Sequence, residues 1–90
     1  MDHIYSVATG SFDIKNKASR AAVKLMKNQD GYVGTIVEPT RSARLLWMYD
    51  SLNNAKIARN TAEGYGIKCG SNIVEFNMED GDWVPGEVVG

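Results

Sequence analysis

The 90-residue chain has little of the chemistry on which most catalytic and metal sites depend. It contains one cysteine, Cys69, and one histidine, His3. A single cysteine excludes an intrachain disulfide and a cysteine-based zinc site, and it favours a reducing compartment. Histidine is the most frequent general acid or base, so catalysis would have to rely on carboxylates. We therefore expect no catalytic residues, no metal, no cofactor and no enzymatic activity.

Long hydrophobic runs are also missing. The longest apolar stretch, residues 45–49, is far shorter than the roughly 20 residues that a membrane-spanning helix requires. Residues 1–6 lack the basic and then apolar layout of a signal peptide. These absences predict a cytoplasmic protein that does not enter a membrane.

Net charge is low as well, at −1 near neutral pH, which argues against nucleic-acid binding driven by overall charge. The charges are nevertheless uneven, because residues 71–90 contain five Asp or Glu and no Lys or Arg, while residues 1–70 contain all ten basic residues. Hydrophobic content of 43% is typical of a folded domain. We expect a single α/β domain over residues 1–90, with the acidic end folded back against the basic part.

Periodicity predicts most of the secondary structure. Alternating apolar residues predict strands over residues 3–9, 32–38, 73–78 and 83–89, and a 3.6-residue period predicts a helix over 14–29. Gly31 supplies the stop for this helix, and Asp80-Gly81 predicts a tight turn before the last strand. Pro85 places that strand on a sheet edge, whereas strand 32–38, apolar on both sides, reads as a central or doubly buried strand.

A second, longer helix is predicted over residues 41–63, between Pro39 and Gly64. Its first two turns are apolar on every side. Two interpretations stay open, because a chain of 90 residues has few other residues with which to cover this helix on all sides. The extra apolar surface is either buried under loops and the C-terminal tail or is available to a partner.

The expected order is therefore β-α-β-α-β-β. This order predicts an α+β fold with a small mixed four-stranded sheet and two helices packed on one face.

The leading functional hypothesis is a small non-catalytic interaction module of the inhibitor or adaptor type. Its partner is another protein or a second copy of itself, bound through the apolar helix surface around Trp47. Aromatic residues are enriched at the cores of such interfaces. The predicted partner-binding residues are Leu46, Trp47, Tyr49 and Ile57.

Nucleic-acid binding is the first alternative. Four basic residues form a stripe on the polar side of helix 14–29, at a spacing that suits phosphate contacts or an acidic protein. An amphipathic helix also needs a solvated face, and the stripe fits that role equally well. We call these residues the basic stripe: Lys17, Arg20, Lys24 and Lys27.

Phosphate or nucleotide binding at the Gly10-Ser11 loop is the second alternative, because backbone N–H groups between a strand and a helix can hold a phosphate. Residues 10–13, Gly-Ser-Phe-Asp, resemble the start of the motif of adenylyltransferases of the phosphopantetheine type. The His-x-Gly-His part of that motif is replaced by residues 14–17, Ile-Lys-Asn-Lys. A capped strand-to-helix turn accounts for the same residues.

Overall fold

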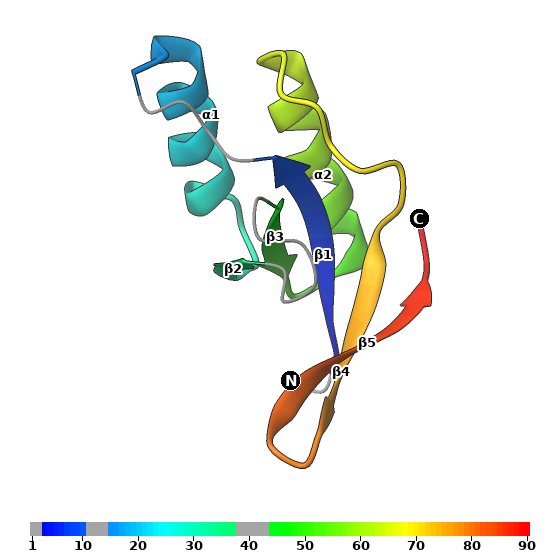
Figure 1. The fold of residues 1–90 in the computed structure, drawn as a ribbon. Helices are drawn as coiled ribbons and strands as arrows, with labels where there is room; N and C mark the ends of the chain where they lie inside the picture. Colours follow the sequence, from blue (N-terminus) through cyan, green and yellow to red (C-terminus); the bar gives the residue numbers. More distant parts are fainter. Residues whose placement is uncertain (1–2, 11–14, 38–43) are drawn as a thin grey trace.

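The protein is an α+β domain, seen in a computed structural model that describes residues 3–10, 15–37 and 44–90. In these ranges five strands and two helices follow one another along the chain (Figure 1). Their bounds are β1 His3–Gly10, α1 Lys17–Asn28, β2 Tyr32–Val37, β3 Arg44–Tyr49, α2 Leu52–Gly64, β4 Val74–Glu79 and β5 Asp82–Val88.

The strands form one sheet in the order β2-β3-β1-β4-β5, and every neighbouring pair is antiparallel. The mixed four-stranded sheet is therefore wrong in its strand number and in its pairing. Strands β1 and β2 do run parallel across α1, but β3 lies between them, and β1 separates β3 from β4 in the same way. This interlocking of two split β-α-β units is the ferredoxin-like connectivity, with β5 added at one edge.

The predicted helix over residues 41–63 is also wrong. Residues 44–49 form strand β3, and the helix starts only at Leu52; residues 38–43 lie outside the described part of the chain. Ser51 caps the helix, since its Oγ accepts a hydrogen bond from the N–H of Asn54 at 3.1 Å. The apolar run without a period belongs to a strand covered on both faces, which looks like a buried helix in sequence. The central position expected for strand 32–38 belongs to β3, and β2 is an edge strand.

Residue types that favour helix caps and turns occupy those positions in the structure. Asn16 caps α1, because its Oδ1 accepts from the N–H of Ala18 at 2.9 Å and from that of Ser19 at 3.2 Å. Gly31 follows α1 with a φ of 80°. Asp80 and Gly81 take positive φ in the β4–β5 turn, and β5 is the predicted edge strand.

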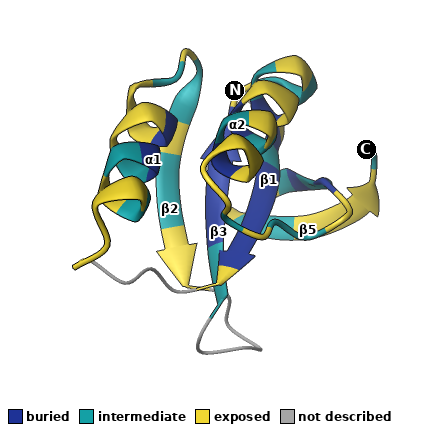
Figure 2. Cartoon of the chain, turned by 90° about the horizontal axis from the view of Figure 1, so that it is seen from above, coloured by how far each residue is buried: buried dark blue, intermediate teal, exposed yellow. Residues whose placement is uncertain are grey.

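Both helices cover the same face of the sheet, as predicted (Figure 2). Three alanines of α2 are fully buried and let the helix approach the sheet closely, while Trp47 and Tyr49 fill the space between the layers. We call this layer the helix-side core: Val7, Met26, Trp47, Tyr49, Ala55, Ala58, Ala62 and Ile73.

The other face of the sheet carries neither α1 nor α2, yet it holds a second apolar cluster of Ile4, Ala8, Leu46, Met48 and Phe76. The β4–β5 hairpin twists across the end of the sheet (Figure 1) and carries Trp83 against this cluster. A register shift opposite Glu75 lets the hairpin bend. We call this side the helix-free face.

Candidate binding site on the helix-free face of the sheet

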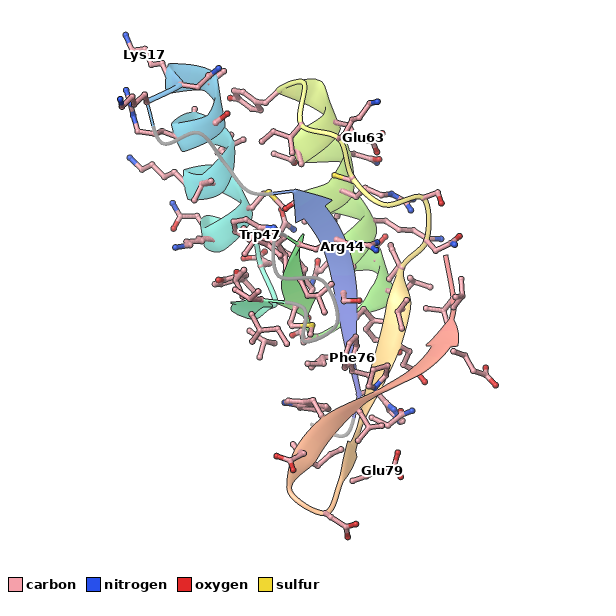
Figure 3. All side chains as sticks on the ribbon, viewed as in Figure 1. Lys17, Arg44, Trp47, Glu63, Phe76 and Glu79 are labelled. Carbon is pink, nitrogen blue, oxygen red and sulfur yellow. The ribbon has the colours of Figure 1, made fainter. Side chains whose placement is uncertain are left out.

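A cavity of about 420 Å³ opens on the helix-free face. Every one of the five strands contributes at least one side chain to it, and one more residue comes from the segment before β4. Figure 3 marks Arg44 beside the upper half of β1 and Phe76 beside its lower end. The lining residues are Ser6, Ala8, Ile36, Arg44, Leu46, Asn72, Val74, Phe76, Trp83 and Pro85.

Strand alternation and register together build this lining. On β1, Val7 faces the helix-side core, so its neighbours Ser6 and Ala8 face the cavity. Ala8 pairs with Leu46 and Phe76 pairs with Pro85, which brings side chains from four strands onto the same face. A shift of one residue in any pairing would turn that strand's lining residue toward the helices.

The one hydroxyl group among the lining residues, that of Ser6, is already hydrogen-bonded within the protein. Ser6 is 3% exposed, and its Oγ donates a hydrogen bond to the carbonyl of Val74 at 3.0 Å. A buried hydroxyl with a partner inside the protein does not need one from a ligand. Apolar contact is therefore what the floor offers to an occupant.

A positive charge stands at one end of the cavity. The Arg44 guanidinium reaches across β1, because a Cβ built on Gly70 would lie 2.9 Å from its Nη2 and 3.3 Å from the Cβ of Ala8. Gly70 is held against β1 by a hydrogen bond from its N–H to the carbonyl of Ala8 at 2.8 Å. The absence of a side chain at Gly70 thus makes room for the arginine.

Apolar surface continues beyond the cavity on the same face. Met78 of β4 lies outside the lining and is 43% exposed, and Ile36 of β2, which lines the cavity, is still 46% exposed. Trp83, which pairs with Met78 across β4 and β5, is half-buried. An occupant that covers the whole apolar area must therefore be larger than the cavity itself.

The four predicted partner-binding residues do not form one surface. Leu46 lines the cavity, whereas Trp47 and Tyr49, 2% and 0% exposed, point to the other side of the sheet and lie beneath the helices. Ile57 is exposed on α2. The apolar helix surface around Trp47 does not exist because successive residues of a strand face opposite sides.

The polar atoms of the two buried aromatic side chains both have hydrogen-bond partners inside the protein. The Trp47 indole N–H donates to the Thr9 hydroxyl at 2.8 Å, and the Tyr49 hydroxyl donates to the carbonyl of Met26 at 2.7 Å. Tyr32 also packs edge-on against Tyr49, with ring centroids 5.7 Å apart. Burial raises the pKa of Tyr49 well above its usual range.

The basic stripe is formed as predicted, on the exposed side of α1, with Lys17, Arg20, Lys24 and Lys27 all exposed. The acidic end does not fold back onto it. Lys17 and Glu79 lie at opposite ends of the molecule (Figure 3), and the β4–β5 turn carries the acidic residues away from α1. The charge of the protein is therefore polarised between its two ends.

Other reactive groups are placed as follows. His3 Nδ1 lies 2.5 Å from Asn77 Oδ1 and 3.9 Å from a carboxylate oxygen of Glu75. Burial raises the pKa of the Cys69 thiol to about 11. In residues 3–10, 15–37 and 44–90, no three His, Cys, Asp or Glu side chains gather to hold a metal ion. Ser11 and the rest of the predicted phosphate loop, residues 11–14, lie outside the described residues.

Neither α1 nor α2 is long and apolar enough to span a membrane.

Comparison with known proteins gives no relative: no protein-family model, no curated protein and no solved structure matches the chain. The ferredoxin-like connectivity occurs with many functions and identifies none of them.

Sequence reasoning missed most of the cavity lining. Alternation did place Val74, Phe76 and Met78 on one face of their strand. It contained no information on which strands flank that face or which face the helices cover. The contributions of Ile36, Arg44 and Trp83 depend on strand order, which no local pattern encodes.

Proposed function

We propose that the protein is a non-catalytic interaction module, of the inhibitor or adaptor type, that holds an apolar segment of another protein against its helix-free face. The observation that carries this proposal is the cavity of about 420 Å³, in which seven of the ten lining residues are apolar. Fully desolvated aromatic and aliphatic pockets are where most of the binding energy of protein interfaces is concentrated.

The chemistry of the cavity defines the partner. Phe76 and Trp83 offer flat apolar surface to an aromatic or branched aliphatic side chain. Arg44 at one end carries five N–H donors and suits a backbone carbonyl or a carboxylate beside that anchor. The expected ligand is an extended peptide segment with one bulky apolar side chain and an acceptor next to it.

A polypeptide fits better than a small molecule. The volume alone falls within the range of about 300–1,000 Å³ that small-molecule sites occupy. A small molecule confined to the cavity would, however, leave Met78 in water, because Met78 is 43% exposed and lies outside the lining. A peptide segment that extends past the cavity along β4 covers Met78 as well and gains the free energy of burying it.

The test uses peptides selected from a random phage-display library on the full-length protein, with affinities measured by calorimetry. We expect the selected peptides to be rich in aromatic and branched aliphatic residues. Met78→Lys should weaken their binding at least about tenfold, because it places a charge against an apolar contact. Ile57→Lys is the matched control, since Ile57 is equally exposed, at 41%, but lies on α2.

Two results would overturn the proposal. One is recovery of no peptide, or of peptides that bind Met78→Lys as tightly as wild type. The other is binding of the apolar dye anilinonaphthalene sulfonate in the cavity without any peptide that displaces it, which would identify a small-molecule site.

Nucleic-acid binding through the basic stripe is the second candidate. Its support is the exposure of all four cations on α1, together with the distance between α1 and the acidic β4–β5 turn. The separation means that the low net charge does not describe the potential near α1. A salt-dependence test for this candidate is given in the Discussion.

A further inference from the structure

The two edges of the sheet differ in how they are protected. Edge strand β5 contains Asp82, Pro85 and Glu87, and a register shift interrupts its pairing with β4. Charges, proline and bulges are the devices that prevent an edge from pairing with another strand. Edge strand β2, Tyr-Val-Gly-Thr-Ile-Val, also has a register shift, between Tyr32 and Gly34, but it contains no charge and no proline.

Exposed apolar side chains lie on both faces of edge strand β2. Val33, Ile36 and Val37 are 43%, 46% and 54% exposed, and no strand in the described part of the chain pairs with this edge. An edge strand offers a row of backbone N–H and C=O groups, so the occupant that completes it is another extended strand. The exposed valines and isoleucine require that strand to be apolar and uncharged.

We propose that β2 pairs antiparallel with β2 of a second copy of this chain. An antiparallel pair exchanges N–H and C=O bonds reciprocally, so one strand can serve as its own partner about a two-fold axis. A charged residue near the axis would lie close to its own copy in this arrangement, and β2 has no charged residue. The matching chemistry is therefore present in the chain itself.

Shape favours one register. With the two-fold axis at Thr35, each Ile36 lies opposite the partner's Gly34, within the part of β2 from Gly34 to Val37 that pairs regularly with β3. Gly34 has open space around the position of a Cβ, with no atom within 4 Å. The large side chain thus packs over the residue that has none, on both sides of the axis.

The paired sheets would form one continuous sheet of ten strands, since each copy contributes five. The cost is that α1, which packs beside β2 (Figure 2), brings two basic stripes toward each other. This repulsion is long-range and screened by salt, so the dimer should be weak at low ionic strength. Ile36 belongs to both the proposed dimer contact and the cavity lining, but Val33 and Val37 do not line the cavity, so a variant at Val37 tests the pairing separately from peptide binding.

Sedimentation velocity over a wide range of protein concentrations, in about 0.3 M salt to screen the stripes, tests the pairing. We expect a monomer–dimer equilibrium that Val37→Lys weakens at least about tenfold. Val88→Lys is the matched control, because Val88 is an exposed valine, at 60%, on the opposite edge strand. It should leave the dimer unchanged, and Val37→Lys should leave peptide binding in the cavity unchanged.

Hydrogen exchange on the wild-type protein provides a second measurement that needs no variant. Amides of residues 32–37 should exchange more slowly as the protein concentration rises, while those of β5 should not. The proposal is overturned by a concentration-independent monomer, by a dimer that tolerates Val37→Lys, or by a dimer that Val88→Lys disrupts equally. Concentration-dependent protection confined to any other element would overturn it as well.

Discussion

The indole nitrogen of Trp47 donates a hydrogen bond to the Thr9 hydroxyl at 2.8 Å and so joins the two central strands, β3 and β1, beneath the helices. The Thr9 hydroxyl in turn donates to the carbonyl of Gly10 at 3.1 Å. Both side chains are 2% exposed. Trp47 is therefore a structural residue of the helix-side core and not part of a binding surface.

Trp47→Phe should destabilise the protein by about 2–4 kcal/mol, because it leaves a cavity and removes the N–H partner of a buried hydroxyl. Urea denaturation would measure the change in the free energy of unfolding. Trp83→Phe is the control, since Trp83 is half-buried on the helix-free face and should cost less than about 1.5 kcal/mol. Equal losses for the two variants would contradict the interior role of Trp47.

Gly31→Ala should destabilise the protein by about 1–3 kcal/mol for two reasons. Gly31 has a φ of 80°, and a Cβ there would lie 2.1 Å from Oδ1 of Asp50. Gly64→Ala is the contrasting variant, since that helical glycine has no atom within 4 Å of a Cβ. It should be neutral or stabilise by up to about 1 kcal/mol. Thermal unfolding of both variants would measure the difference, and a neutral Gly31→Ala would contradict the strained turn.

The Cys69 thiol should react slowly with Ellman's reagent at pH 8, because burial raises its pKa to about 11 and leaves little thiolate. The reaction rate should keep rising until about pH 11. Stability should fall in the same window. Above the ordinary pKa of 9.0 the unfolded thiol loses its proton while the folded one retains it, so the unfolded state gains from each rise in pH.

Cys69→Ala isolates this contribution, since it removes the titrating group. The difference in unfolding free energy between wild type and Cys69→Ala should change between about pH 9 and about pH 11 and be constant below pH 9. A thiol that reacts at pH 8 as fast as free cysteine would show that the side chain is not protected.

If the basic stripe binds nucleic acid, affinity for DNA or RNA should fall steeply with salt. The slope of log K against log salt should become shallower by about one to two when Lys17 and Lys24 are both changed to Gln, because each phosphate contact releases counterions. Lys56→Gln on α2 is the control, an exposed lysine outside the stripe. Absence of any gel shift at low salt would eliminate this function.

Local patterns determined the elements whose period or turn chemistry is unambiguous. Alternation located β1, β2, β4 and β5 to within two residues at each end, and the helical period located the body of α1. Gly31 and Asp80-Gly81 adopt the positive φ angles that their turns require. These features depend on neighbours in sequence, which is why they could be predicted.

Strand β3 could not be identified in the same way. Five of its six residues, Leu45 to Tyr49, are apolar and point to both faces, because β3 lies between β2 and β1 with a core on each face. Such a run carries neither the two-residue nor the 3.6-residue period. The poor helix formers Asn53-Asn54 do indicate a break within the predicted helix, and in the structure α2 begins just before them, after its cap Ser51.

By itself, then, the sequence determined that this is a small α+β domain with both helices on one face, and that its reactive groups are few. Only the tertiary structure decided that β3 and β1 are central, that β2 is an unprotected edge, and that Trp47 is interior while Phe76 and Trp83 line a cavity. The physical reason is the separation along the chain over which each interaction acts. Periodicity and turn residues act between neighbours in the chain, whereas strand order and register arise from contacts between residues far apart in sequence, such as Ala8 with Leu46.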